Sequence, residues 1–284
     1  MRTNMVSLVF AATLIPVAAN AQQWRTIESA RQLTNTEQTR ISLTFAGGNF
    51  ELRPLPGKLL YQMQLRYDEQ SADAVHRFNA DHHELTLGMS KAHLGWRALH
   101  ATNRDNAGSM TVGLNPSVPM MLELNLGGAQ ADVELGGMRV KGLKLNLGLV
   151  GSKVRFSSPN QIVMDELSVD VGLGGVEFEE LGNANVAQID INGGMDGVAL
   201  GFGDNVMRDV KINAHVALGG LKIQVPRSVG VTVQADTKLA NFKPQGFTKR
   251  NESWFTPNWN ETSTHVTIVV NAALGSLEVI HSAP

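Results

Sequence analysis

One short phrase of alternating apolar and polar residues recurs through the middle of the chain, between positions 120 and 225. Its copies are LELNLG at 122–127, LKLNLG at 143–148, LSVDVG at 167–172, QIDING at 188–193 and, more loosely, VKINA at 210–214. Strict alternation over this length is typical of a β-strand with one buried face. The closing glycines at 127, 148, 172 and 193 are 21, 24 and 21 positions apart. A repeat of this period predicts a stack in which neighbouring copies bury one another's apolar sides.

A second alternating strand follows each glycine turn. These second strands are DVEL at 132–135, KVRF at 153–156, VEF at 176–178, VAL at 198–200 and LKIQV at 221–225. One repeat therefore contains two short strands and two turns. We predict an all-β fold of stacked short strands, solenoid-like rather than a flat sandwich.

The polar positions of the repeat predict which side chains stack on one another. The centres of the first strands form a predicted column of amides and carboxylates, a pattern that ties stacked strands together: Asn125, Asn146, Asp170, Asp190 and Asn213. The outward positions of the second strands form another predicted row: Glu134, Arg155, Glu177, Ala199 and Lys222. Its first three members would place opposite charges side by side.

Two carboxylates of the predicted column, Asp170 and Asp190, are expected to be neighbours that repel each other. Bound Ca²⁺ would relieve this repulsion, and Asn192 and Asp196 offer further oxygen ligands around a glycine turn. The glycine-rich repeat of calcium-binding β-rolls is absent, so a ladder of asparagine and aspartate side chains is the preferred interpretation.

The repeats divide the chain into a signal peptide (1–21), an N-terminal β region (22–119), the repeat stack (120–226) and C-terminal strands (227–284) that continue the same fold. Alternation at 40–45, 49–53, 58–67 and 83–88 favours a β cap at the N-terminal end. The polar residues 22–38 are expected to be partly helical or loose. A terminal repeat must hide its open edge, so an atypical, aromatic C-terminal cap is also expected.

The first 21 residues have the pattern of a cleaved export signal. Arg2 precedes an apolar run over 5–17, and Ala19 and Ala21 form a small-x-small cleavage site. The apolar run is shorter than the ~20 residues that a membrane-spanning helix needs. We expect cleavage near Ala21 and a mature chain outside the cytoplasm, periplasmic or secreted, without a membrane span.

Composition and motifs exclude several classes of function. Lys and Arg number 24 against 26 Asp and Glu, so no excess of cations is available for the backbone of a nucleic acid. The absence of cysteine excludes disulfides, thiolate metal sites and a cysteine nucleophile. No nucleophile elbow, zinc-protease motif or phosphate-binding glycine loop is present, so we expect neither enzymatic activity nor a cofactor.

Histidines are concentrated in one part of the N-terminal region, where Asp81 and Glu84 lie near His76, His82, His83 and His93. Imidazole and carboxylate groups suit zinc. Adjacent residues on a strand point to opposite faces, however, which favours surface histidines over a metal site.

Six segments carry a family resemblance when taken in order along the chain: 41–52 (ISLTFAGGNFEL), 122–128 (LELNLGG), 143–148 (LKLNLG), 156–160 (FSSPN), 181–184 (LGNA) and 273–278 (ALGSLE). Together they resemble the toast-rack family of exported bacterial proteins, from about residue 39 to 281. A weaker resemblance extends to the C-terminal domains of LiaF-type cell-wall stress-response proteins and to exported adhesin domains. The resemblance implies an all-β stack at the cell envelope, often paired with stress sensing, and it implies no catalytic or binding residues. Direct membrane signalling is not expected, because the transmembrane helices of LiaF-type proteins are missing.

Trp254, Phe255 and Trp259 are the candidate ligand-binding residues, in a polar loop over 241–262. An aromatic ring with a polar rim can stack on a sugar, whereas the alternative is a hydrophobic cap for the stack. We predict a non-enzymatic envelope protein that binds or scaffolds, linked to envelope stress. The alternative is a carbohydrate-binding or carbohydrate-active protein that uses this loop. The expected partner is an envelope protein or a cell-wall glycan, and edge strands offer a route to oligomers.

Overall fold

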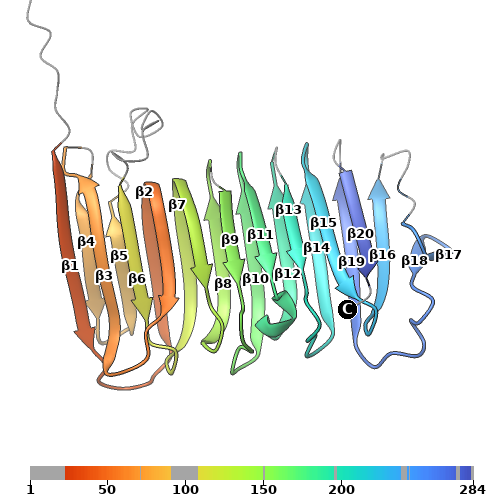
Figure 1. Ribbon diagram of the computed structural model, residues 1–284, viewed down its shortest axis with the longest axis horizontal. Helices are drawn as coiled ribbons and strands as arrows, with labels where there is room; N and C mark the ends of the chain where they lie inside the picture. The colour runs from red at the N-terminus through yellow and green to blue at the C-terminus, as the bar shows by residue number, and fades with distance from the viewer. Residues whose placement is uncertain are drawn as a thin grey trace, which may run out of the picture.

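The computed structural model describes residues 23–70, 72–90, 108–149, 151–194, 197–237, 242, 244–272 and 276–282. They form a long row of strands standing side by side (Figure 1). The expected signal peptide, His93, Asp196 and residues 273–275 lie outside the described residues. The part that is described is all-β apart from a short 3-10 turn, Leu181–Ala184, which confirms the predicted fold class.

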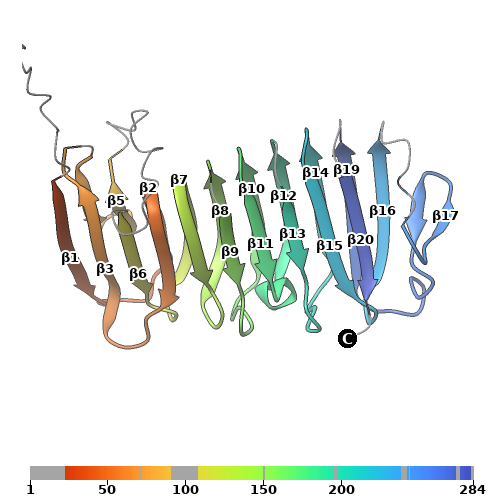
Figure 2. The ribbon, with the colours of Figure 1, turned by 45° about the horizontal axis from the view of Figure 1, so that its top comes forward.

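Most strands are parallel and in register with their counterparts one repeat away. The first face joins, in spatial order, β8 (Arg139–Leu147), β10 (Met164–Val171), β12 (Val186–Gly193), β14 (Val210–Val216), β19 (His265–Ala272) and β16 (Gly230–Thr237). The arrowheads of β8, β10, β12 and β14 all point to one edge of the stack in Figure 2. This edge carries the glycine turns and is called the turn edge.

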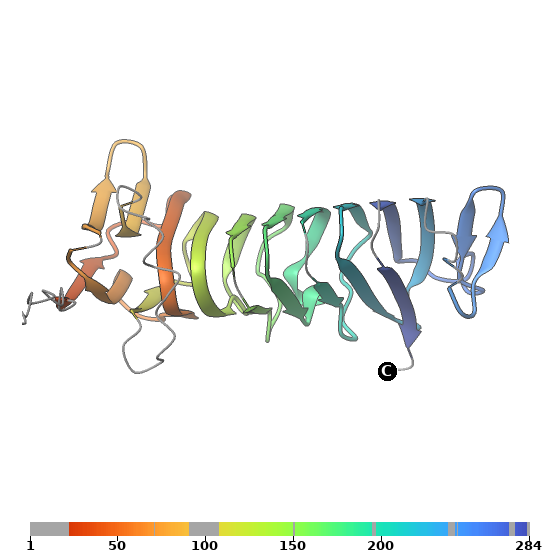
Figure 3. The same cartoon turned by 90° about the horizontal axis from the view of Figure 1, so that it is seen from above.

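The second face is also parallel. It joins β9 (Gly151–Arg155), β11 (Gly175–Glu179), β13 (Val198–Gly201), β15 (Gly220–Pro226) and β20 (Ser276–Ser282). Two long strands, β2 (Thr39–Pro54) and β7 (Pro119–Glu134), run through both faces and connect them. Figure 3 shows the two faces along the length of the stack. The predicted repeat of two strands and two turns is confirmed.

Apolar side chains from both faces fill the interior in columns. One column of the first face contains Ile41, Leu122, Leu143, Leu167, Ile189, Ile212, Ile268 and Val233, all buried. A column of the second face contains Leu52, Val133, Val154, Phe178, Leu200, Ile223 and Val279. Each repeat therefore buries its neighbours' apolar residues, which is the stabilising arrangement that the alternation predicts.

Glycines at the turn edge let successive backbones touch. The Gly148 N–H donates to the Leu126 carbonyl at 2.8 Å, and the Leu149 N–H donates to the Gly127 carbonyl at 2.7 Å. A β-carbon on Gly148 would lie 2.6 Å from that Gly127 oxygen. The same close approach recurs at Gly194, where a β-carbon would lie 2.5 Å from the Gly172 oxygen. These positions require glycine because the previous repeat occupies the space of a side chain.

Buried asparagines connect the loops on the opposite edge. Asn160 accepts a hydrogen bond from the Val140 N–H at 2.8 Å and donates to the Val140 carbonyl at 2.8 Å. Asn183 donates to the Phe156 carbonyl at 2.9 Å, and Asn205 donates to Asn183 Oδ1 at 2.7 Å. Side-chain amides thus pair the polar backbone of loops that no strand partner reaches.

The N-terminal end of the stack departs from chain order. β5 (Glu84–Met89) and β6 (Ser109–Leu114) both pair with β2, which therefore lies between them and β7. Antiparallel strands cover the end: β4 (Ala74–Asn79) on β5, β3 (Leu59–Asp68) on β6, and β1 (Trp24–Gln32) on β3. The expectation that 22–38 is helical or loose is wrong over β1, because this polar segment pairs with β3 along its whole length.

The C-terminal end repeats this inversion. β19 and β20 lie between the β14–β15 repeat and β16, although β16 comes earlier in the chain. Two short antiparallel strands, β18 (Ser253–Phe255) and β17 (Thr248–Arg250), extend the first face beyond β16. Hydrogen bonds therefore cross both predicted domain boundaries, at 119/120 and 226/227.

The glycine contacts predict opposite effects for two substitutions in one turn. Gly148→Ala should lower the free energy of unfolding by about 1–3 kcal/mol, because its β-carbon collides with the Gly127 carbonyl. Gly151→Ala should raise it by about 0.4–1 kcal/mol, because nothing lies within 4 Å of its β-carbon and the unfolded chain loses freedom. Urea unfolding of both variants measures this, and equal effects would contradict the backbone contact.

Candidate functional site

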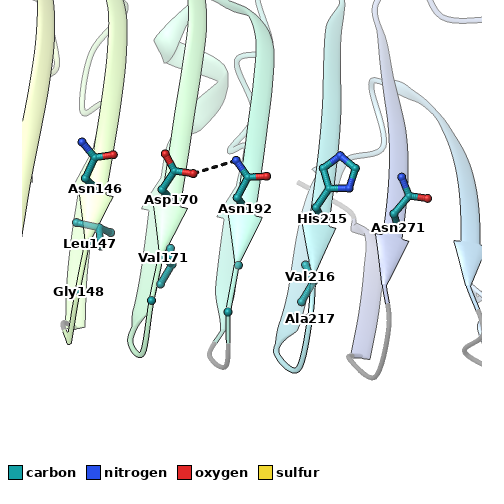
Figure 4. Close-up of a pocket in the computed structure, with 13 residues that line it drawn as sticks. Asn146, Leu147, Gly148, Asp170, Val171, Asn192, His215, Val216, Ala217 and Asn271 are labelled. Carbon is teal, nitrogen blue, oxygen red and sulfur yellow. Dashed lines mark hydrogen bonds between the residues drawn. The ribbon is translucent and has the colours of Figure 1, made fainter.

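A row of polar side chains crosses the exposed side of the first face, two residues before the turn edge. We call it the polar column: Asn146, Asp170, Asn192, His215 and Asn271 (Figure 4). Its members are about 4.8 Å apart because they sit on adjacent hydrogen-bonded strands. The column borders a groove of 1040 Å³ that is otherwise lined by glycines and apolar residues near the turn edge.

Hydrogen bonds orient part of the polar column. Asn192 Nδ2 donates to Asp170 Oδ1 at 2.9 Å (Figure 4). Asn146 Nδ2 donates to Asn125 Oδ1 at 2.8 Å and to Glu123 Oε1 at 3.1 Å. Asn192, His215 and Asn271 are exposed. The column therefore lines the groove with amide, carboxylate and imidazole groups, and hydrogen bonds orient those of Asn146, Asp170 and Asn192.

The predicted Asp170–Asp190 neighbour pair is wrong. Asp170 lies opposite Asn192, whereas Asp190 lies opposite Ser168 and Asn213. Asn213 Nδ2 donates to Asp190 Oδ1 at 2.7 Å, and Gln188 Nε2 donates to its Oδ2 at 2.6 Å. The two carboxylates occupy different rows, so the repulsion that motivated a calcium site does not arise.

The second face carries a row of charges beside a groove of 1130 Å³. In spatial order the row contains Glu51, Asp132, Lys153, Glu177, Ala199, Lys222 and Glu278. Glu134 lies opposite Arg155 as predicted, but Arg155 lies opposite Glu179 rather than Glu177. Opposite charges therefore do lie side by side, but the third member of the predicted row is Glu179, two residues after Glu177.

Ion pairs on this face perturb two carboxylates, Glu179 and Asp132. Lys153 Nζ and Arg155 Nε donate to the Glu179 carboxylate at 2.6 and 2.7 Å, and these hydrogen bonds lower the pKa of Glu179. A paired hydrogen bond from the Arg53 guanidinium, with distances of 3.2 and 2.7 Å, likewise lowers the pKa of Asp132. The charges on this face compensate one another within the protein.

The histidine-rich segment does not gather into one cluster. His76 lies on β4, His82 lies in the following turn, and His83 Nε2 contacts Glu37 Oε2 at 2.5 Å. Among the residues that the structure describes, no three His, Asp or Glu side chains are grouped as a metal ion would require.

The three aromatic candidates are half-buried at the C-terminal end. Trp254 packs against the apolar core, with Lys249 Nζ 5.6 Å from the centre of its ring. Phe255 and Trp259 meet edge to face with centroids 5.4 Å apart, and the His265 ring lies 4.4 Å from Trp259. These contacts favour a cap, and sugar binding by the loop stays a prediction.

The family model of the N-terminal domain of toast_rack (DUF2154) matches residues 18–179, which is more than half of the chain. The chain belongs to the toast-rack family. The family predicted from the segments at 41–52, 122–128 and 143–148 is therefore confirmed. No curated protein matches the sequence.

Two solved structures are similar to this toast-rack chain. A candidate cell adhesion protein from Clostridium sporogenes is 14% identical, with a TM-score of 0.44, and the match covers 92% of this chain and 100% of that one. A candidate adhesin from Bacteroides fragilis is 10% identical, with a TM-score of 0.43, and the match covers 91% and 97%. Likenesses this distant carry no conclusion about a ligand. In the described part of the chain, no helix has the length and apolar character of a membrane span.

None of the five members of the polar column is among the ligand-binding residues predicted from the sequence. The repeat pattern predicts stacking for Asn146 and Asp170 and suggests Asn192 only as a calcium ligand, and it does not single out His215 or Asn271. Asn192 and His215 lie two positions before the turn-edge residues Gly194 and Ala217. The distance from the turn therefore predicts their place in the column of this toast-rack protein, whereas the position within the repeated phrase does not.

Acid should destabilise the folded wild-type protein more than it destabilises a Glu179→Gln variant. The fold lowers the pKa of Glu179, so its ionised carboxylate stabilises the folded protein at pH values above its ordinary pKa of 4.5. This stabilisation is lost as the pH falls through the lower pKa that Glu179 has in the folded protein. The melting temperature measured from pH 7 to pH 3 should therefore fall less steeply in Glu179→Gln. Glu166→Gln is the control, since Glu166 is exposed and forms no ion pair with described residues. Equal slopes in all three proteins would refute the ion-pair effect.

The cap interpretation predicts that Trp254→Ala destabilises the protein. The free energy of unfolding should fall by about 2 kcal/mol. This is less than for a fully buried tryptophan, because Trp254 is half-buried. Trp254→Phe should recover most of it, as measured by chemical unfolding. An unchanged stability combined with the loss of an oligosaccharide-induced thermal shift would instead establish a sugar platform.

Proposed function

We propose that this toast-rack protein is an exported, non-enzymatic binding or scaffolding module of the cell envelope, and that the polar column contacts its ligand. The observation that carries the proposal is the alignment of five polar side chains along one groove. They come from five successive strands of a hydrogen-bonded face, so their spacing is set by the backbone.

A preformed row of this kind suits an extended ligand with many polar groups. Side-chain amides donate and accept hydrogen bonds, and carboxylates accept them. Hydroxyl and amide groups, which pair with both, recur along a cell-wall glycan or an extended polypeptide. Binding to fixed side chains also loses less conformational entropy than binding to a loop. A glycan or an envelope protein lying along the stack therefore fits the column better than a compact small molecule.

The ionisable groups support a role without catalysis. Among described residues, the carboxylates with lowered pKa are Asp132 and Glu179, and both are engaged in surface ion pairs. Burial lowers the pKa of His281, whose Nε2 lies 3.0 Å from the Val229 carbonyl oxygen. These shifts are explained by structural contacts and lie outside the groove of the polar column.

Export and a link to envelope stress complete the proposal. The N-terminal pattern ending at Ala21 supports export, and the resemblance to cell-wall stress-response proteins supports the link to stress. The competing function, carbohydrate binding or turnover by the 241–262 loop, is tested separately by the Trp254 variants.

A double substitution, Asn192→Ala with His215→Ala, should weaken ligand binding by about tenfold or more, because it removes two central polar contacts of the column. The probe is a mixture of soluble peptidoglycan fragments, measured by calorimetry and thermal shift. At concentrations about 100 times the Kd, the wild type should gain about 2.7 kcal/mol, equivalent to several degrees.

The matched control is Lys222→Ala with Glu278→Ala, which removes an exposed pair with a 3.7 Å contact from the opposite face. This variant should bind as the wild type does. Equal weakening in both variants would contradict the assignment of the polar column, and chemical conversion of the fragments would contradict a non-enzymatic role.

A further inference from the structure

Three exposed leucines occupy the same position in turns of the stack. Leu149, Leu173 and Leu218 donate their N–H groups to the carbonyls of Gly127, Gly148 and Gly194 at 2.7, 2.9 and 2.9 Å. These bonds continue the register of the strands beyond the polar column. The three side chains therefore lie along one line at the turn edge, and we call them the leucine ridge.

The ridge is apolar and open. Its leucines are 44%, 47% and 51% exposed, and they account for half of the large apolar residues that are exposed in the described part of the chain. The four turn sequences 148–151, 172–175, 194–197 and 217–220 contain a single charged residue, Asp196. Each has Leu or Met at its second position, which is periodic rather than incidental. A periodic row of exposed leucines of this kind marks an interaction surface.

Polar rows flank the ridge at similar depth on both faces. Asn146 precedes Leu149 by three residues, and Lys153 follows it by four. At no more than about 3.3 Å per residue, both rows stand within roughly 10–13 Å of the ridge. This matches the geometry of an interfacial element whose apolar edge enters the boundary of a bilayer by about 5–10 Å while polar groups remain at the headgroups.

The charges beside the ridge select the kind of lipid surface. Lys153, Glu177 and Lys222 alternate in sign along one flank, and Asp170 and His215 lie on the other. Alternating charges complement zwitterionic headgroups, each of which carries a phosphate and an ammonium group. They do not complement an anionic surface, and the net charge of −2 opposes one.

We propose that the leucine ridge seats the stack, turn edge down, on a zwitterionic lipid bilayer. A ridge is convex, so a protein partner would need a matching groove, whereas the acyl boundary of a bilayer accepts a ridge directly. This inference goes beyond the proposed function and does not depend on ligand binding by the polar column.

The test is flotation of residues 22–284, which contain every described strand, with phosphatidylcholine vesicles. The wild type should float, and Leu149→Gln/Leu173→Gln/Leu218→Gln should lower the vesicle-bound fraction about tenfold or more. The control is Met121→Gln/Val163→Gln/Met207→Gln, which changes the other exposed apolar residues, 39%, 38% and 46% exposed, and should float normally. All proteins should keep the wild-type melting temperature.

A tryptophan probe reports insertion independently of flotation. The emission of Leu173→Trp should shift to the blue on addition of the vesicles, and that of Val163→Trp should not. Added phosphatidylglycerol should lower the vesicle-bound fraction, because the net charge of −2 opposes an anionic surface, whereas high salt should not abolish binding, because the ridge is uncharged.

Absence of flotation by the wild type, or normal flotation by the ridge variant, would overturn the proposal. So would a binding signal that salt removes. A dimer by light scattering that the ridge substitutions dissociate, without vesicle binding, would show that a second copy covers the ridge. The peptidoglycan assay with the polar-column variant is unaffected by any of these results, so the two proposals fail separately.

Discussion

Backbone contact between successive glycine turns at the turn edge sets the geometry of the whole stack. The Gly148 N–H donates to the Leu126 carbonyl, and the Gly127 oxygen would lie only 2.6 Å from a β-carbon on Gly148. Because successive repeats close against one another at this point, every row of side chains inherits the same spacing. The apolar columns, the polar column and the leucine ridge therefore share one spacing from each repeat to the next.

The alternation of apolar and polar residues and the spacing of the glycines predict the strands and the two-strand repeat. Apolar residues at every second position all face the core only if the segment is a β-strand. The prediction fails at Gly193 and Gly194, where either glycine can be taken to close the phrase. In the structure Ile189 stacks on Leu167, which places Asn192 rather than Asp190 beside Asp170. Packing of the apolar column decides the register, and sequence spacing alone misses it because the loops differ in length.

Loop and end contacts are less predictable because their partners are backbone groups. Asn160 and Asn183 lie in segments without periodicity, and each is explained only by the carbonyls and N–H groups of a neighbouring repeat. Similarly, β1 is polar along most of its length and becomes a strand because β3 offers it an open edge. The sequence predicts the polar column only in part for the same reason: its members are defined by pairing across strands.

The inverted order at both ends has a consequence for how such a protein is made and how it changes in length. β2 gains its β7 neighbour only after residue 119 has been synthesised, and β16 waits for β19, so neither end can close in the order of translation. Between β8 and β15, by contrast, neighbours in sequence are neighbours in space. Whole repeats can be gained or lost there without disturbing either closure. The two ends therefore stay the same, while the length of the stack between them can change by one whole repeat at a time.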